Sequence, residues 1–183
     1  MRRVSPTTPW LALLSSPGLA GEPVELEAAG GNESPRATVE QRMKLNEAGR
    51  NLIGKGADAT LVTLNPDGSP QVSLVWVALE STPDGDELVT AHLAEHKKVR
   101  NVRNDPRVAV TIVSLDGAGQ GMRPYLSIKG TARIVEGGAP ELLRQLNPIL
   151  GDPNMTFPPD GAPPGLLTRI RIDKVGGIGP WVS

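Results

Sequence analysis

The chain has 183 residues, of which 19 are basic, 20 are acidic and none is cysteine. A net charge of −1 provides no overall field that would attract nucleic acid or an anionic membrane, so we expect neither as a partner. The lack of cysteine excludes disulfides, thiolate catalysis and cysteine-ligated metal centres. No apolar stretch approaches the ~20 residues that span a bilayer, and we predict a cytoplasmic protein.

The first 38 residues differ in composition from the rest. Arg2 and Arg3 precede a short apolar run at 10–14, and a stretch rich in Gly, Pro, Ser and Glu follows. The apolar run is shorter than the roughly 7 to 15 residues of a secretory signal, and the composition cannot offset the entropy of ordering the chain. We predict a disordered extension over 1–38 and one domain over 39–183.

The pattern from residue 39 onward predicts a helix followed by a hairpin. Apolar residues recur at helical intervals over 39–53, and Gly54 and Gly56 suit a helix end. Two β-rich runs, 59–64 and 70–79, then flank the turn sequence Asn-Pro-Asp-Gly-Ser at 65–69. These signals place the first two strands side by side in antiparallel order.

Four more strands and two more helices are expected. The strands are predicted at 88–93, 107–115, 125–136 and 166–175, with a short helix between the third and fourth strands and a longer helix at 139–150. Gly130 is expected to bend or bulge the fifth strand. Six short strands at hairpin spacing predict a closed or nearly closed antiparallel barrel with helices packed outside.

The segment 95–107, EHKKVRNVRNDPR, concentrates positive charge in a nearly neutral chain. On a helix, Val99 and Val102 would dock onto the barrel. Lys97 and Lys98 would fall in the first turn, where unsatisfied backbone N–H groups already favour anions, and the pair would attract a phosphate. A solvated helical face remains the alternative interpretation.

Other chemistries find little support in the sequence. Arg103, Asp105 and Arg107 are adequately explained as local ion pairs that end a helix. With one Phe, one Tyr and three Trp, the chain lacks the stacking residues typical of nucleic-acid binding. His92 is expected in a strand and His96 at a helix start, so the two do not form a helical metal site, and no metal ligands are predicted.

Three stretches together resemble a known family. ATLVTLNPDGSPQVSLVWV, LVTAHLAEHKKVRNVRNDPRVAVTIV and YLSIKGTARIV resemble the split β-barrel flavin and deazaflavin oxidoreductases related to pyridoxamine 5′-phosphate oxidase. The lysine-x-x-Asn-Val-Arg-x-Asp-Pro-Arg pattern at 98–107 is most similar to the branch that uses coenzyme F-420. The resemblance covers about residues 43 to 183 and implies a six-stranded antiparallel split β-barrel with flanking helices.

The resemblance also implies which residues bind the cofactor. Lys98 matches the lysine that binds the cofactor phosphate, and Lys97 lies near a position that is often arginine. The strand from Gln71 to Trp76 matches the one that lines the isoalloxazine-type ring. The implied cofactor-binding residues are Gln71, Ser73, Val75, Trp76, Thr90, Lys97, Lys98, Asn101 and Trp181. Asn101 could instead brace its helix, and either Trp76 or Trp181 could be a core or interface residue.

The implied activity needs no catalytic side chain, because the ring system itself carries the hydride. We expect an oxidoreductase that uses reduced coenzyme F-420 to reduce a small conjugated organic substrate. An FMN-dependent oxidase or reductase of the same fold is one alternative, and a non-catalytic flavin-binding or haem-binding barrel is another. The resemblance further implies a homodimer with two cofactor sites at the interface, each built from both chains.

Overall fold

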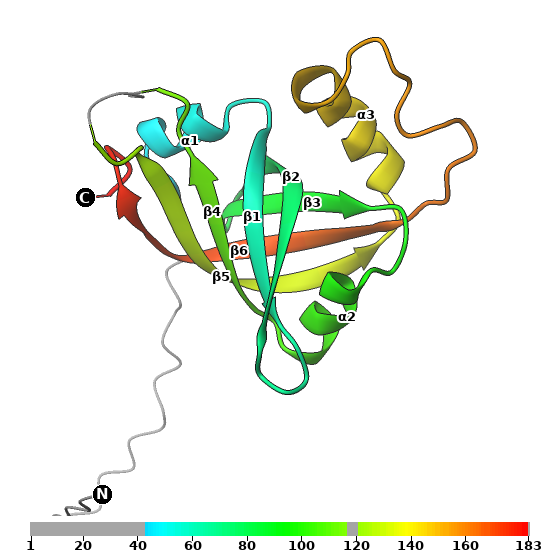
Figure 1. The fold of residues 1–183 in the computed structure, drawn as a ribbon, viewed down its shortest axis with the longest axis horizontal. Helices are drawn as coiled ribbons and strands as arrows, with labels where there is room; N and C mark the ends of the chain where they lie inside the picture. The colour runs from blue at the N-terminus through cyan, green and yellow to red at the C-terminus, as the bar shows by residue number, and fades with distance from the viewer. Residues whose placement is uncertain (1–42, 117–120, 183) are drawn as a thin grey trace, which may run out of the picture. The chain divides into compact units, whose positions relative to one another are not determined.

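The computed structural model describes residues 43–116 and 121–182, so the extension predicted over 1–38 lies outside the described residues. Helices and strands follow one another mainly as the sequence predicts (Figure 1). In chain order the elements are α1 (Glu47–Ile53), β1 (Ala57–Leu64), β2 (Pro70–Thr82), β3 (Gly85–His92), α2 (Lys97–Asn104), β4 (Arg107–Val113), β5 (Tyr125–Glu136), α3 (Ala139–Leu150) and β6 (Leu166–Ile178).

The first helix is shorter than predicted. Its apolar periodicity suggested a start near residue 39, but α1 begins at Glu47 because Asn46 caps it, its side-chain oxygen accepting a hydrogen bond from the Gly49 N–H at 2.9 Å. Just before the cap, the Leu45 N–H donates to a carboxylate oxygen of Asp86 at 2.8 Å. This tie fixes the chain in a non-helical conformation at Leu45, so that part of the prediction was wrong.

The six strands close into one antiparallel barrel in the order β1-β2-β3-β6-β5-β4. The prediction of a six-stranded antiparallel barrel with flanking helices is therefore confirmed. A register shift between Lys129 and Gly130 confirms the bulge predicted in β5. A Cβ at Gly130 would lie only 2.4 Å from the backbone oxygen of Arg171 on β6, so the bulge requires glycine at this position.

The helices complete the hydrophobic core. Val99 and Val102 of α2 are buried, as their spacing predicted, and α1 contributes Ile53; α1 and α2 lie at opposite ends of the barrel (Figure 1). Outside the barrel, α3 packs on β2 and β3, where Leu142 and Leu146 join a smaller apolar cluster. In the described part of the chain, no helix has the length and apolar character to cross a membrane.

The outer wall formed by β2, β1 and β4 carries exposed apolar side chains beyond the part of β2 on which α3 packs. On β2, Val72 and Leu74 are 64% and 73% exposed. The strand registers place Val62 of β1 beside Val72, and Ala109 of β4 beside Val62. Alternate residues of a strand share one face, so these side chains form a continuous outer surface, which we call the β2-β1-β4 face.

Candidate functional site

A pocket of about 360 Å³ lies where β2, β3, α2 and α3 meet. Its position follows from the topology, because β2 and β3 are neighbours in the barrel while α2 follows β3 directly along the chain. The residues that line it are Leu74, Val75, Trp76, Thr90, Ala91, His92, Leu93, His96, Lys98, Leu143 and Phe157.

One wall of the pocket is apolar and aromatic. The rings of Trp76 and Phe157 meet edge to face, with centroids 6.1 Å apart. Leu74, on the same face of β2 as Trp76, extends this wall, and Leu143 adds to it from α3. Val75 also lines the pocket, from the face of β2 that packs in the core. Such a wall is suited to the flat face of a ring system, which gains both apolar burial and ring packing there.

Other lining residues form a polar and cationic wall. Lys98 lies in the first turn of α2, as predicted, and burial lowers the pKa of its ammonium group. Thr90, which also lines the pocket, is buried. Among the described residues that line the pocket there is no Asp or Glu, so the charge of Lys98 is available to an anionic ligand.

His92 is the most buried titratable group of this wall. Its side chain sits at the end of β3, the residue is only 4% exposed, and Nε2 lies 2.9 Å from the Thr168 hydroxyl of β6. Burial lowers the pKa of His92 to about 4, with smaller contributions from the charges of Lys98 and His96. The imidazole is therefore neutral at physiological pH.

The structure brings four of the predicted cofactor-binding residues into this pocket, namely Val75, Trp76, Thr90 and Lys98. Lys97 does not line it. Its side chain is exposed, and its charge contributes to lowering the pKa of Asp67 in the turn between β1 and β2. The two lysines at the start of α2 therefore diverge, and only one reaches the pocket.

Gln71, Ser73 and Asn101 lie outside the pocket lining. The Asn101 amide is buried and donates to the side-chain oxygens of Thr63, Asn65 and Gln71, at 3.0 to 3.1 Å. These bonds tie α2 to β1 and β2, which is the bracing role considered for Asn101. Ser73 pairs in register with the buried Leu61, on the face of β2 opposite to the exposed Leu74.

Trp181 also lies away from the pocket of its own chain. It is 7% exposed and belongs to the main core, and its Nε1 donates to the backbone oxygen of Tyr125 at 2.8 Å. Its Cβ is close to Gly49 of α1, so the residue serves the α1 end of the barrel. Its assignment to a cofactor site stays a prediction.

Two arginines of the 95–107 segment are held in ion pairs. Arg103 pairs with Glu136 at 2.6 Å and with Glu95 at 3.1 Å. Arg107 pairs with Asp105 at 2.5 Å directly after α2, which confirms the interpretation of these two residues as a local ion pair at the helix end.

Sequence reasoning missed several pocket residues. Leu143 and Phe157 come from α3 and from the proline-rich segment after it, and no local pattern places either residue beside β2. His92 was considered only as a metal ligand. Its position at the end of a strand, six residues before Lys98, is a signal that could have suggested a shared polar wall.

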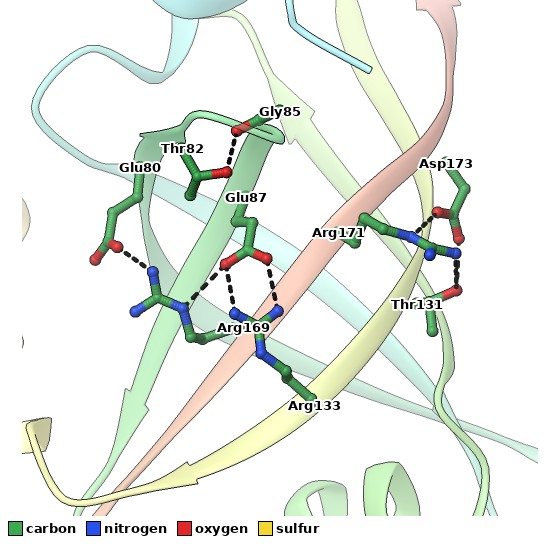
Figure 2. A network of polar contacts seen from close by, with 9 residues as sticks. All are labelled: Glu80, Thr82, Gly85, Glu87, Thr131, Arg133, Arg169, Arg171 and Asp173. Carbon is green, nitrogen blue, oxygen red and sulfur yellow. Dashed lines mark hydrogen bonds and ion pairs between the residues drawn. The ribbon is translucent and has the colours of Figure 1, made fainter. Parts of the chain in front are cut away.

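A second hollow, of about 370 Å³, lies on the outer wall formed by β3, β6 and β5. Its charges neutralise one another (Figure 2): Glu87 accepts hydrogen bonds from Arg133 and Arg169, and Arg169 also pairs with Glu80. The Arg133 hydrogen bond, with help from Arg169, holds the pKa of Glu87 below its ordinary value despite burial. This hollow offers no uncompensated charge comparable to Lys98.

The barrel fold agrees with the outcome of a comparison with protein families. The model of the family described as pyridoxamine 5′-phosphate oxidase matches residues 45–176. The chain belongs to the pyridoxamine 5′-phosphate oxidase family. The match covers β1 to β5 in full and β6 except for its last two residues. The resemblance noted from sequence motifs is therefore confirmed.

Solved structures show the same fold at low sequence identity. An F-420 reductase is 24% identical with a TM-score of 0.56, over 69% of this chain and 94% of that protein. A conserved hypothetical protein of Mycobacterium tuberculosis is 23% identical with a TM-score of 0.53, over 75% and 86% of the two chains. The HupZ protein of Group A Streptococcus is 14% identical with a TM-score of 0.52, over 75% and 96%. No match was found among curated proteins.

Proposed function

We propose that this pyridoxamine 5′-phosphate oxidase family member is an oxidoreductase that binds reduced coenzyme F-420 and transfers a hydride to a small conjugated organic substrate. The observation that supports this most is the pocket itself, which joins an aromatic wall at Trp76 to Lys98 in a described lining that contains no Asp or Glu. The F-420 reductase with the same fold supports the choice of cofactor.

The residues present fit such a cofactor. Leu74 and Trp76 offer an apolar surface to a planar ring system, and Lys98 offers a charge-assisted hydrogen bond to a phosphate. α2 fixes the position of Lys98, because Val99 and Val102 anchor the helix in the core and Asn101 braces it. The two requirements of the ligand are met by residues that line one pocket.

In this reaction the protein mainly positions the cofactor and the substrate. When bound, the deazaflavin ring supplies the hydride. The chain contributes an apolar surface at Trp76 and Phe157, against which the ring and a substrate would pack. We assign no catalytic residue, in keeping with the sequence analysis.

We also propose that the protein is a homodimer whose second copy covers the β2-β1-β4 face. Val72 and Leu74 expose large apolar side chains on this face, and soluble monomers rarely leave such contiguous patches uncovered. Leu74 belongs both to this face and to the pocket lining. A partner seated there would close the open side of the pocket, so each site would be built from both chains.

A binding titration of coenzyme F-420 against the purified protein, followed by tryptophan fluorescence, tests the proposal. Lys98→Ala should weaken F-420 binding roughly tenfold or more, because one charge-assisted hydrogen bond is lost. Lys97→Ala is the matched control: it removes the same charge from the adjacent residue, which does not line the pocket, and should change the affinity by less than about threefold.

FMN is the competing ligand in the same titration. Tighter binding of FMN than of F-420 would favour the FMN-dependent alternative. F-420 binding without hydride transfer to any of a panel of conjugated acceptors would favour a non-catalytic carrier. Equal effects of the Lys97 and Lys98 substitutions would contradict the phosphate assignment.

A further inference from the structure

The pocket contains a polar group, His92, to which the proposed function assigns no role. His92 is buried, with 4% of the residue exposed, and lines the pocket together with Lys98. Nε2 of His92 forms a hydrogen bond with the Thr168 hydroxyl at 2.9 Å. In the described part of the chain, Nδ1 of His92 has no hydrogen-bond partner. No fully buried side-chain nitrogen or oxygen of the described residues lacks a partner, so Nδ1 must reach open space, which the pocket provides.

The hydrogen bond to Thr168 determines which nitrogen carries the proton. Thr168 is 1% exposed. Among the described residues, the hydroxyl of Thr168 forms its hydrogen bond with Nε2 of His92. A buried hydroxyl that cannot donate is costly, so the Thr168 O–H donates to Nε2. A neutral imidazole then carries its proton on Nδ1 and presents an N–H donor to the pocket.

We propose that His92 is a neutral hydrogen-bond donor to the anionic group of the ligand, and that the pocket thereby selects a phosphodiester over a phosphomonoester. This inference rests on the proposed function. Lys98 is the one Lys, Arg, Asp or Glu among the described residues that line the pocket. A phosphodiester carries one negative charge, whereas a monoester carries about 1.5 to 2 at this pH.

The charge balance explains the selection. One ammonium group neutralises a diester, and the His92 donor adds a directional bond without adding charge. A monoester would keep part of a second charge that the pocket does not neutralise, beside the apolar surface of Val75 and Trp76. Coenzyme F-420 carries its phosphate as a diester and FMN as a monoester, so the two probes report the preference directly.

The proton position is tested first, by imidazole ¹⁵N NMR of the His96→Gln protein. The chain has two histidines, so this variant leaves the His92 signals alone. We expect a neutral ring protonated on Nδ1, with an Nδ1–H signal that shifts when F-420 is added. A proton on Nε2, or an Nδ1–H signal that F-420 does not shift, overturns the proposal.

The selection is tested by titrating F-420 and FMN against wild type and three variants, with thermal melting to confirm that each variant is folded. His92→Phe removes the donor and should weaken F-420 binding roughly tenfold. His92→Asn places an amide N–H near the position of Nδ1 and should recover most of that loss. His92→Arg adds a charge and should move the ratio of affinities toward FMN by about tenfold.

The outcomes separate this inference from the proposed function. F-420 binding that is unchanged in His92→Phe overturns the donor role alone, and an affinity ratio unchanged in His92→Arg overturns the charge selection alone. A wild type that prefers FMN, or that binds neither ligand, overturns both this inference and the proposed function.

Discussion

At the scale of single residues, the buried carboxylate of Asp86 links the start of the domain to the barrel. Its side chain is fully buried, accepts the Leu45 N–H, and pairs with Nη2 of Arg50 at 2.6 Å. The Asp86 N–H in turn donates to the backbone oxygen of Met43. These contacts fix the segment before α1 on the β2-β3 hairpin, in place of the helix that the apolar periodicity predicted.

Replacing this carboxylate should destabilise the fold. We expect Asp86→Asn to lower the free energy of unfolding by about 2 kcal/mol, since Arg50 loses its ionic partner but stays partly in water. Urea unfolding followed by circular dichroism measures the change. The control is Arg107→Gln, which breaks an exposed pair with Asp105 and should cost less than about 1 kcal/mol; equal losses would contradict the role of Asp86.

The buried His92 makes stability depend on pH. Its folded pKa, lowered to about 4 by burial, lies below the unfolded value of about 6.5. Between these values the unfolded chain binds the proton more readily, so stability falls as pH drops. Lys98 and His96, the charged and titratable groups that face His92, act in the same direction.

We expect the free energy of unfolding to fall by about 2 kcal/mol from pH 7.5 to pH 5 on account of His92. Urea unfolding at the two pH values measures it. His96→Gln should retain most of the decline, because His96 is exposed, whereas His92→Asn should largely remove it. A decline of the same size in His92→Asn would show that other groups cause it.

At the scale of elements, the β5 bulge sets the path of the strand that pairs with both β4 and β6. A Cβ at Gly130 would lie 2.4 Å from the Arg171 backbone oxygen and 2.7 Å from Cγ2 of Ile170. Backbone atoms of a central ladder cannot move aside as a surface side chain can. The bulge and the glycine therefore require each other.

Gly130→Ala should lower the free energy of unfolding by about 2 kcal/mol or more, through overpacking against β6. Gly176→Ala offers a control in the same pair of strands, because a Cβ there would have no atom within 4 Å. We expect that control to stay within about 0.5 kcal/mol of wild type. Thermal and urea unfolding of the two variants measure the change. Similar losses of unfolding free energy in Gly130→Ala and Gly176→Ala would contradict the overpacking argument.

The elements themselves could be predicted from local chemistry, since turn residues, strand alternation and the Val99-Val102 spacing act within a few positions. The second helix and the glycine bulge were confirmed on those grounds. The start of α1 could not be read from periodicity, because a cap at Asn46 and a contact 41 residues away, from Leu45 to Asp86, determine it.

The candidate site could be predicted only in part, for a related reason. Lys98, Thr90, Val75 and Trp76 lie on elements whose order the motifs define, and they do line one pocket. The direction in which a side chain points away from its helix or strand is harder to predict from the sequence. Lys97 is exposed and does not line the pocket, and Phe157 reaches Trp76 from a segment without regular structure.

At the scale of the whole molecule, the barrel has two kinds of outer wall. The β3-β6-β5 wall carries the network of Glu87, Arg133 and Arg169, whose charges are mutually satisfied (Figure 2). The β2-β1-β4 face carries exposed apolar side chains, Val72 and Leu74 among them. A polar, self-satisfied wall tolerates water, whereas the apolar face gains free energy from being covered.

Charge placed on the apolar face should therefore dissociate the proposed dimer. We expect wild type to sediment as a dimer and Val72→Glu as a monomer, because an unpaired carboxylate would be buried at the contact. Ile149→Glu introduces the same charge at a half-exposed position on α3 and should leave the dimer intact. A monomeric wild type, or a dimeric Val72→Glu, would contradict the interface.

The same variant connects assembly to ligand binding. Val72 does not line the pocket, but its neighbour on that face, Leu74, does. If the partner closes the open side of the pocket at Leu74, Val72→Glu should weaken F-420 binding about tenfold or more while the barrel stays folded, and Ile149→Glu should not. Affinity in the monomeric variant equal to that of wild type would show that each chain binds its ligand alone.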